Sequence, residues 1–181
     1  MVSSLHDFAK FLEITGILKR IRRTGWVNIG VNQPESVADH TFRTAFLCMV
    51  YADMAGLNPL RLIRMALIHD LHEAVIGDLT PTQKTKEIKK GEKKAIQEIL
   101  SLLPEIQREK YLEVWKEYQE GQTKEAKAVR QLEKIEMALQ AKEYERLGMD
   151  NKKLERFITS VKNIISWPDL RSLLSYIVED K

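Results

Sequence analysis

The sequence has few of the residues that build disulfide-bonded, β-rich or membrane-spanning proteins. Cys48 is the one cysteine among 181 residues, so it forms no disulfide within the chain and offers no cysteine-based zinc pattern. Eight glycines and five prolines are too few for the many tight turns of a β-sandwich or barrel. No apolar run approaches the ~20 residues that span a bilayer, and no basic segment followed by an apolar core indicates a signal peptide. We therefore expect a soluble, cytoplasmic protein without a membrane partner.

Neither sign of charge is in large excess. The 29 basic and 26 acidic side chains leave a formal net charge of +3, which does not argue for nucleic-acid binding. Hydrophobic residues make up 44% of the chain and charged residues 30%, which is the ordinary balance of a globular protein. A chain of this length can bury a core of its own, so we predict a single domain over residues 1–181.

Local start and stop signals divide most of the chain into helices. Ser36 and Asp39 form the S-x-x-D pattern of a capping box, which predicts a helix over about 37–55 that Gly56 ends. Ser4 is the expected cap of the first helix. Similar signals predict helices over about 5–15, 59–70, 84–103, 104–118 and 123–147, and two short ones that begin near 151 and 168.

The remaining segments are interpreted as connections. Residues 19–31 carry four basic side chains and are expected to form a loop that is at most briefly extended, and residues 77–81 form a second loop. No alternation of polar and apolar residues is long enough to indicate a sheet. We therefore predict an all-α fold, an irregular helical bundle, with the C-terminal helices of residues 151–178 packed on the rest.

The segment His69-Asp70-Leu71-His72-Glu73 carries the first sign of chemistry. On a helix, Glu73 lies four residues after His69 and three after Asp70, so the three side chains project toward one side. Imidazole and carboxylate ligands suit ions such as Zn²⁺, Mn²⁺, Co²⁺ or Ni²⁺ better than Ca²⁺. A His-Asp pair alone is frequent by chance, but His40 adds a second histidine in the first turn of its own helix, about thirty residues upstream.

Five blocks of the sequence resemble those of the HD-domain 5′-deoxynucleotidases, in order and at comparable spacing. They are Arg-Arg-Thr-Gly-Trp at 22–26, Pro-Glu-Ser-Val-Ala-Asp-His at 34–40, Ile-His-Asp-Leu-His-Glu-Ala at 68–74, Gly-Asp-Leu-Thr-Pro at 77–81 and Leu-Gln-Ala-Lys-Glu-Tyr-Glu at 139–145. The likeness covers residues 15–147 or so. It implies an HD-type all-α fold, a homodimer, a catalytic divalent ion (Mn, Co, Ni, Zn or Mg) and removal of the 5′-phosphate from deoxyribonucleoside monophosphates.

The resemblance also implies the ligands of the metal. His40, His69 and Asp70 match the family's first three ligands, and the fourth is usually an aspartate on a late helix. The register of the block at 139–145 places Glu133 at that position. Glutamate keeps the charge and the oxygen donors but adds a methylene, so Glu136, three residues further on, is the alternative ligand.

Two acidic residues beyond the ligands are candidate catalytic groups. A phosphate monoester dianion repels nucleophiles, so the site must supply positive charge and an activated water. Glu73 lies beside the ligands, and the resemblance supports a role for it in orienting or deprotonating that water. Similarity suggests a catalytic role for Asp78 too, either as proton donor to the leaving 5′-oxygen or as a holder of a second ion. The alternative for Asp78 is a plain turn residue.

The substrate-binding candidates begin in the loop before His40. A guanidinium binds phosphate with two parallel hydrogen bonds, and in the resembling family an arginine and a tryptophan of this loop contact the nucleotide. Either Arg22 or Arg23 fits the arginine, and Trp26 either offers its face to the nucleoside or packs under the loop. The predicted set is completed by His40, Asp70, Asp78, Leu79, Thr80 and Pro81.

Neighbouring charged residues are interpreted more plainly. His72 is expected to point away from the side of His69. The lysines form a solvated helix face that could also attract an anionic substrate; they are Lys84, Lys86, Lys89, Lys90, Lys93 and Lys94.

Two other functions fit the same residues. One keeps the HD site but acts on a cyclic dinucleotide, a deoxynucleoside triphosphate or an alarmone; the match of the blocks at 22–26 and 77–81 argues against it. The other is a helical module that binds nucleotides without turnover, and the departure at Glu133 is the sequence feature that favours it.

Overall fold

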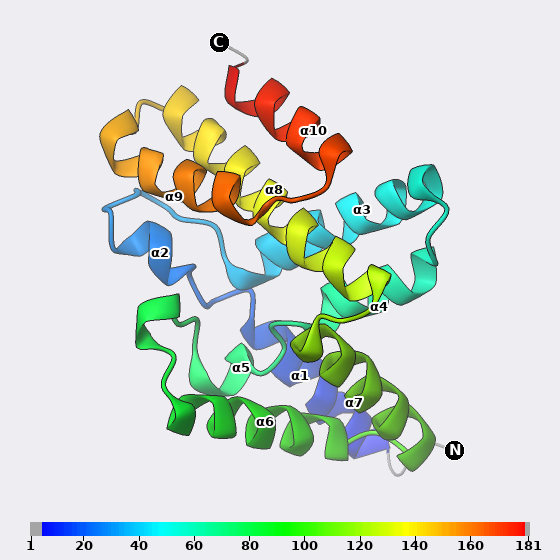
Figure 1. The fold of residues 1–181 in the computed structure, drawn as a ribbon. Helices are drawn as coiled ribbons and strands as arrows, with labels where there is room; N and C mark the ends of the chain where they lie inside the picture. Colours follow the sequence, from blue (N-terminus) through cyan, green and yellow to red (C-terminus); the bar gives the residue numbers. More distant parts are fainter. Residues whose placement is uncertain (1–4, 180–181) are drawn as a thin grey trace.

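The computed structural model describes residues 5–179, which are mostly helical (Figure 1). The helices are α1 (Leu5–Ile17), α2 (Thr24–Val27), α3 (Val37–Ala55), α4 (Pro59–Ile68), α5 (Glu73–Ile76), η1 (Pro81–Gln83), α6 (Lys86–Ser101), α7 (Glu105–Glu120), α8 (Lys124–Arg146), α9 (Asn151–Ile164) and α10 (Pro168–Glu179). Within this range no sheet forms, and an isolated bridge pairs Arg22 with Ser36. The predicted all-α class is confirmed, while the predicted cap Ser4 lies outside the described residues.

The caps inferred from the sequence account for several helix ends. The Ser36 hydroxyl accepts the Asp39 amide at 3.1 Å, and the Asp39 carboxylate accepts the Ser36 amide at 2.8 Å, so the capping box of α3 is complete. Gly56 ends α3 with a φ of +65°, a conformation that favours glycine. The Asn58 side chain accepts the Arg61 amide at 3.1 Å and begins α4.

The structure differs from the sequence prediction where tertiary contacts decide the local conformation. Residues 24–27 form the short helix α2 inside the segment predicted as a loop, because Trp26 is buried there and the Thr24 amide is bonded to Asp78. The helix predicted over 59–70 ends at Ile68, and a turn over 69–72 precedes α5. Glu73 therefore does not continue the helix that leads to His69.

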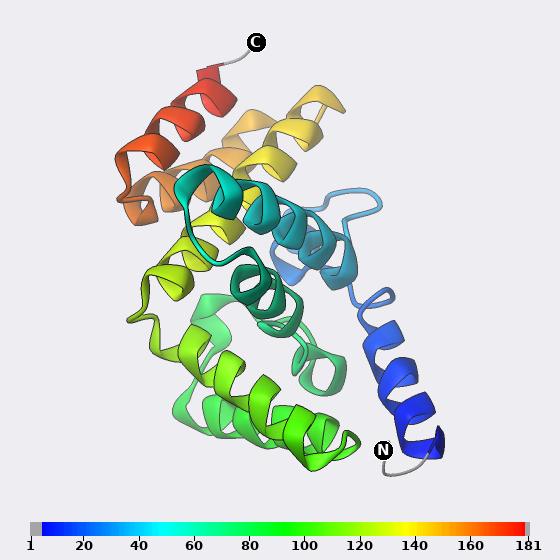
Figure 2. The same ribbon diagram turned by 90° about the vertical axis from the view of Figure 1, so that its right-hand side faces the viewer.

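Helix α8 is the central element of the packing. Figure 1 shows α8 crossing the middle of the molecule, with α9 and α10 on one side and α6 and α7 on the other, and Figure 2 shows the same order after a quarter turn. Helices α3, α4, α7, α9 and α10 all pack against it. Leu62, Met65, Leu132 and Ile135 are among the fully buried side chains of the core, and Cys48 is buried with them as a small apolar residue.

A smaller cluster of buried residues joins the N-terminal connection to the end of α8. It comprises Trp26, Ile29, Ala141, Tyr144 and Leu154. This cluster holds α2 against α8 and α9, and it positions one wall of the cleft described below. No helix in residues 5–179 is both long enough and apolar enough to cross a bilayer.

Removal of the α3 cap should destabilise the protein measurably. Ser36→Ala deletes the hydroxyl that accepts the Asp39 amide, and we expect a loss of about 1 kcal/mol, or a fall in Tm of roughly 2–4 °C. Ser101→Ala, an exposed site at the end of α6, is the matched control and should leave Tm nearly unchanged. Circular dichroism measures the Tm of each variant. Equal Tm values for the two variants would show that the cap contributes nothing to stability.

Candidate active site

Four ligand-type side chains from three parts of the chain meet at the centre of the molecule. His40 comes from the first turn of α3, His69 and Asp70 from the turn after α4, and Glu133 from the middle of α8. His69 Nε2 lies 3.0 Å from Asp70 Oδ2 and 3.5 Å from Glu133 Oε2, while His40 Nε2 lies 4.0 Å from Asp70 Oδ2. One ligand atom from each of His40, His69 and Glu133 lies within 4.8 Å of the others.

The hydrogen bonds of the two imidazoles leave both Nε2 atoms directed at this point. His69 Nδ1 lies 2.6 Å from the Ala66 carbonyl, which can only accept, so Nδ1 carries the proton. Its buried Nε2 has no hydrogen-bond partner. His40 Nδ1 contacts the Glu136 carboxylate, which leaves its Nε2 facing Asp70. Such contacts fix the tautomer of metal-binding histidines.

The donor set fits a divalent cation. Two imidazole lone pairs and two carboxylates turned toward one buried point repel one another unless positive charge lies between them. Burial and the nearby Arg23 keep the pKa of His40 well below its usual value, so this ring is neutral. Burial also lowers the pKa of His69, but Asp70 and Glu133 outweigh it and raise that pKa, which shows how strongly the site favours positive charge. Nitrogen and oxygen donors in this mixture suit a transition-metal ion.

Glu133 is held so that its longer side chain reaches the cluster. The Tyr118 hydroxyl donates to Glu133 Oε2 at 2.8 Å, and Lys134 Nζ lies 3.1 Å from Oε1. Burial alone would raise the pKa of Glu133, but Lys134 and His69 outweigh it and lower the pKa to about 2. Glu133 is therefore an ionised carboxylate at neutral pH.

Glu136, the alternative ligand from the sequence, lies on the other side of the His40 ring. Its carboxylate contacts His40 Nδ1 and accepts hydrogen bonds from Arg43 at 2.8 and 3.0 Å. Glu35, His40 and Glu136 also lie close enough to form a second cluster of ligand-type atoms. Arg43 binds one oxygen of Glu136 and the His40 ring contacts the other, so this carboxylate is positioned to orient His40.

Arg23 and Asp78 are bound to each other beside the cluster. Arg23 Nη1 lies 3.2 Å from Asp78 Oδ1 and 3.6 Å from Asp70 Oδ2. The second Asp78 oxygen accepts the Thr24 amide at 2.5 Å, and the Thr24 hydroxyl donates to the Asp78 carbonyl at 2.7 Å. Arg22 instead donates to the Pro34 carbonyl at 3.0 Å on the exposed side. Of the two candidate arginines, the structure thus brings only Arg23 to the cluster.

Glu73 is a buried carboxyl group of the site that has an oxygen without a hydrogen-bond partner. Its residue is 2% exposed, and its Oε2 has no hydrogen-bond partner. Burial, followed by the charges of Asp70 and Asp78, raises the pKa of Glu73 to about 10. A buried carboxyl without a structural partner is costly, so its place beside the ligand cluster points to chemistry.

A cleft of about 690 Å³ opens onto these groups. Its volume is in the range of pockets that enclose small organic ligands. Arg23, Asp70, Glu73 and Glu133 form its floor, and the predicted residues Asp78, Leu79, Thr80 and Pro81 form one side. Helix α9 supplies another wall through Arg156, Phe157 and Ser160.

Trp26 lines this cleft but is itself only 2% exposed. Its indole Nε1 donates to Glu35 at 2.8 Å, and its ring contacts Tyr144 and Phe157 at centroid distances of 5.2 and 4.2 Å. The indole thus packs under the loop and also borders the cleft. Phe157 is the aromatic residue on the α9 wall.

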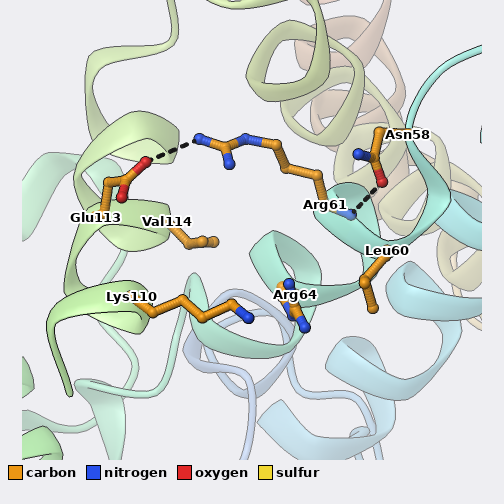
Figure 3. A pocket seen from close by; sticks show the side chains of 7 residues that line it. All are labelled: Asn58, Leu60, Arg61, Arg64, Lys110, Glu113 and Val114. Atoms are coloured by element: carbon orange, nitrogen blue, oxygen red, sulfur yellow. Dashed lines mark hydrogen bonds and ion pairs between the residues drawn. The ribbon is translucent and has the colours of Figure 1, made fainter. Parts of the chain in front are cut away.

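Sequence reasoning missed Phe157 and Tyr118. The sequence contains no local motif around either residue, and each reaches the site only because its helix packs beside α8. A second hollow, between α4 and α7, is not a comparable site (Figure 3). It measures about 80 Å³, contains no histidine, and its Arg61 is paired with Glu113.

Comparison with known proteins points to the same family as the sequence blocks described above. The model of the HD-domain family matches residues 15–171. The chain is 41% identical to the 5′-deoxynucleotidase HDDC2 of Mus musculus, covering 95% of this chain and 87% of that protein. It is 39% identical to the Dictyostelium discoideum protein of the same name, over 98% and 100% of the two chains.

A solved structure has a similar fold. The PH0347 protein of Pyrococcus horikoshii OT3 is 31% identical and superposes with a TM-score of 0.81, over 96% of this chain and 99% of that one. The chain therefore belongs to the HD-domain family. Within that family its curated relatives include several named 5′-deoxynucleotidases.

Loss of the Glu136 carboxylate should weaken metal binding without removing a ligand. Glu136→Gln no longer holds the His40 ring as a charged acceptor, so we expect the Mn²⁺ affinity measured by calorimetry to fall about tenfold or more. Glu143→Gln is the matched control, because Glu143 also accepts from Arg43 but has no contact with His40. Equal Mn²⁺ affinities for the two variants would refute the orienting role.

Proposed function

We propose that this protein is an HD-type 5′-deoxynucleotidase, which hydrolyses the 5′-phosphate of deoxyribonucleoside monophosphates with an activated water. The observation that carries the proposal is the cluster of His40, His69, Asp70 and Glu133. Two of its members, Asp70 and Glu133, line a cleft of nucleotide size together with the unpartnered Glu73. The names of the curated relatives support the same reaction.

We infer that His40, His69, Asp70 and Glu133 hold a divalent cation, with Mn²⁺, Co²⁺, Ni²⁺, Zn²⁺ and Mg²⁺ as the candidates. Such an ion supplies positive charge for a phosphate oxygen and lowers the pKa of a bound water. The two imidazoles are prepared for it by Ala66 and Glu136, which occupy both Nδ1 positions.

Glu73 is proposed as the group that takes the proton of the attacking water. Its Oε2 is buried, has no partner and lines the cleft. Positive charge held at the neighbouring cluster would lower its raised pKa toward neutrality, where a carboxylate serves as a general base. The same group positions the water, since a single buried oxygen offers it one strong acceptor.

Arg23 is proposed to bind the phosphate, and Asp78 to position Arg23. The guanidinium is held between Asp70 and Asp78, and its remaining N–H groups are available to phosphate oxygens. Asp78 also fixes Thr24 at the start of α2, so one carboxylate sets the distance between the arginine loop and the floor of the cleft. A direct proton transfer from Asp78 to the leaving oxygen is a second role that the same location permits.

The nucleoside is proposed to lie between two walls. Leu79, Thr80 and Pro81 form one of them, and Phe157, backed by Trp26, forms the other. An aromatic wall favours bases of any identity, because every base has a flat apolar face. Glutamate in place of aspartate at position 133 was the sequence feature that favoured a binding module without turnover. Glu133 nevertheless lies within 3.5 Å of His69 Nε2, which supports an enzyme instead.

We further propose a cytoplasmic homodimer that associates through α3. Phe42, Phe46, Val50 and Met54 follow one another at intervals of four residues and are 71%, 55%, 43% and 80% exposed. Spacing of this kind places them along one stripe of the helix. A contiguous exposed apolar stripe is typical of a protein–protein contact.

Phosphate release from deoxynucleotides tests the reaction. Protein stripped of metal is supplied with each candidate ion and assayed on deoxyribo- and ribonucleoside 5′-monophosphates. We expect metal-dependent release from deoxyribonucleotides, its loss in His69→Ala, and a fall in kcat of about a hundredfold or more in Glu73→Gln with little change in KM. A folded protein that releases no phosphate with any ion would rule the proposal out.

Sedimentation tests the dimer. Phe42→Asp places a charge at the N-terminal end of the exposed stripe, so we expect the variant to sediment as a monomer at concentrations where the wild type is a dimer. Ile106→Asp changes an equally exposed apolar side chain on α7 and should leave the dimer intact. A monomeric wild type, or the same mass for both variants, would contradict this interface.

A further inference from the structure

Lys84 differs from the other lysines that surround α6. The sequence groups it with them as part of one solvated face, yet its side chain is only 32% exposed and its ammonium lies 3.1 Å from Glu92 Oε1. Lys84 also lines the cleft, as Glu73 does. Lys94, on the outer face of α6, is 79% exposed by comparison.

The partner of Lys84 is Glu92, a buried carboxylate that has no part in the proposed metal site or in the walls of the cleft. The Glu92 side chain is 7% exposed and comes from the inner face of α6. His72 Nε2 lies 3.6 Å from the same oxygen, and His72 directly precedes Glu73 in the chain. A buried carboxylate costs free energy unless it is paired, and an apolar residue here would pack at no such cost. The arrangement therefore suggests that Glu92 serves to hold Lys84 in place.

The charges of the cleft explain why a second cation would be needed. Asp70, Glu73, Asp78 and Glu133 all face the volume that a phosphate dianion would enter. Among the cations that line it, Arg23 is shared between Asp70 and Asp78, and Lys134 is paired with Glu133. Arg130 donates to the backbone carbonyls of residues 118 and 119, and Arg156 lies over the Phe157 ring on the α9 wall, 4.8 Å from its centroid.

Lys84 has donors to spare beside these carboxylates. An ammonium carries three N–H donors, and Lys84 Nζ forms an ion pair with Glu92 Oε1 at 3.1 Å without a hydrogen bond to that oxygen. Although the side chain is partly buried, the pKa of Lys84 is raised, first by Glu92 and then by the charges of Asp70 and Glu73. Lysine is a frequent phosphate ligand as a point charge.

We propose that Lys84 is a phosphate-binding residue of this site and that Glu92, supported by His72, positions it. The inference rests on the proposed function, because it assigns a ligand to the phosphate of the same substrate. It separates Lys84, which touches the phosphate, from Glu92, which acts only through Lys84. The nucleoside part of the substrate, against Phe157 and the loop at 79–81, makes no use of this cation.

Binding of the two halves of the substrate tests the assignment. Calorimetry on the Mn²⁺-loaded protein measures the Kd of inorganic phosphate and, separately, of deoxyadenosine. In Lys84→Met we expect phosphate binding to weaken roughly tenfold to a hundredfold and deoxyadenosine binding to stay unchanged. Lys84→Arg should restore most of the phosphate affinity, and Lys86→Met, on the neighbouring lysine of α6, should match the wild type.

The role of Glu92 is tested by a double-mutant cycle. Glu92→Gln should weaken phosphate binding in the presence of Lys84 and have no further effect in Lys84→Met. Additive losses, or an equal loss of deoxyadenosine affinity, would show a merely structural role and overturn the positioning.

The assignment of Lys84 fails if Lys84→Met binds phosphate as the wild type does, or if the wild type binds none. These outcomes are distinct from a failure of the proposed function, which is a wild type that binds phosphate but hydrolyses no nucleotide.

Discussion

The crowding of four ligand-type groups around one buried point is the constraint on which the rest of the structure depends. Carboxylates and imidazole nitrogens this close repel one another, and each is held by a further contact: Ala66 for His69, Glu136 for His40, Tyr118 for Glu133 and Arg23 for Asp70. Arg43 in turn holds Glu136, and Asp78 holds Arg23. Ala66, Tyr118 and Arg43 lie on helices that pack against α8, and Glu136 lies on α8 itself, so the core and much of the site are built from the same elements.

Sequence patterns predicted best the features that depend on neighbouring residues. The capping box at Ser36 fixed the start of α3 and with it the position of His40, and Asn58 with Pro59 fixed the start of α4. The turn at 69–72 could not be predicted in this way, because a helical continuation satisfies the same residues locally and only the packing around His69 and Glu73 decides against it. The choice between Arg22 and Arg23 likewise depends on Asp78, more than fifty residues away.

The same reasoning explains why the cleft was harder to predict than its floor. The floor consists of Arg23 and the acids Asp70, Glu73 and Glu133, whose residue types and motifs suggest chemistry. Beyond the predicted loop at 78–81, the lining includes Phe157, Tyr118 and Lys84. These are ordinary residue types in amphipathic helices and their connections, and they reach the cleft only through tertiary contacts. Glu133, which stands where the resemblance implies an aspartate, still reaches the cluster, since a tyrosine hydroxyl and a lysine hold its longer carboxylate.

The wall formed by α9 lies outside the segment that carries the ligand cluster. The four residues of the cluster all lie at or before position 133 of the sequence, whereas Phe157 belongs to a helix that begins at Asn151. Substitutions on the cleft side of α9 therefore alter the shape of the cleft without touching a residue of the cluster or of its outer contacts. Under the proposed function, one wall for the nucleoside and the hydrolytic chemistry are carried on separate stretches of the chain, so selection can change that wall while the chemistry is kept.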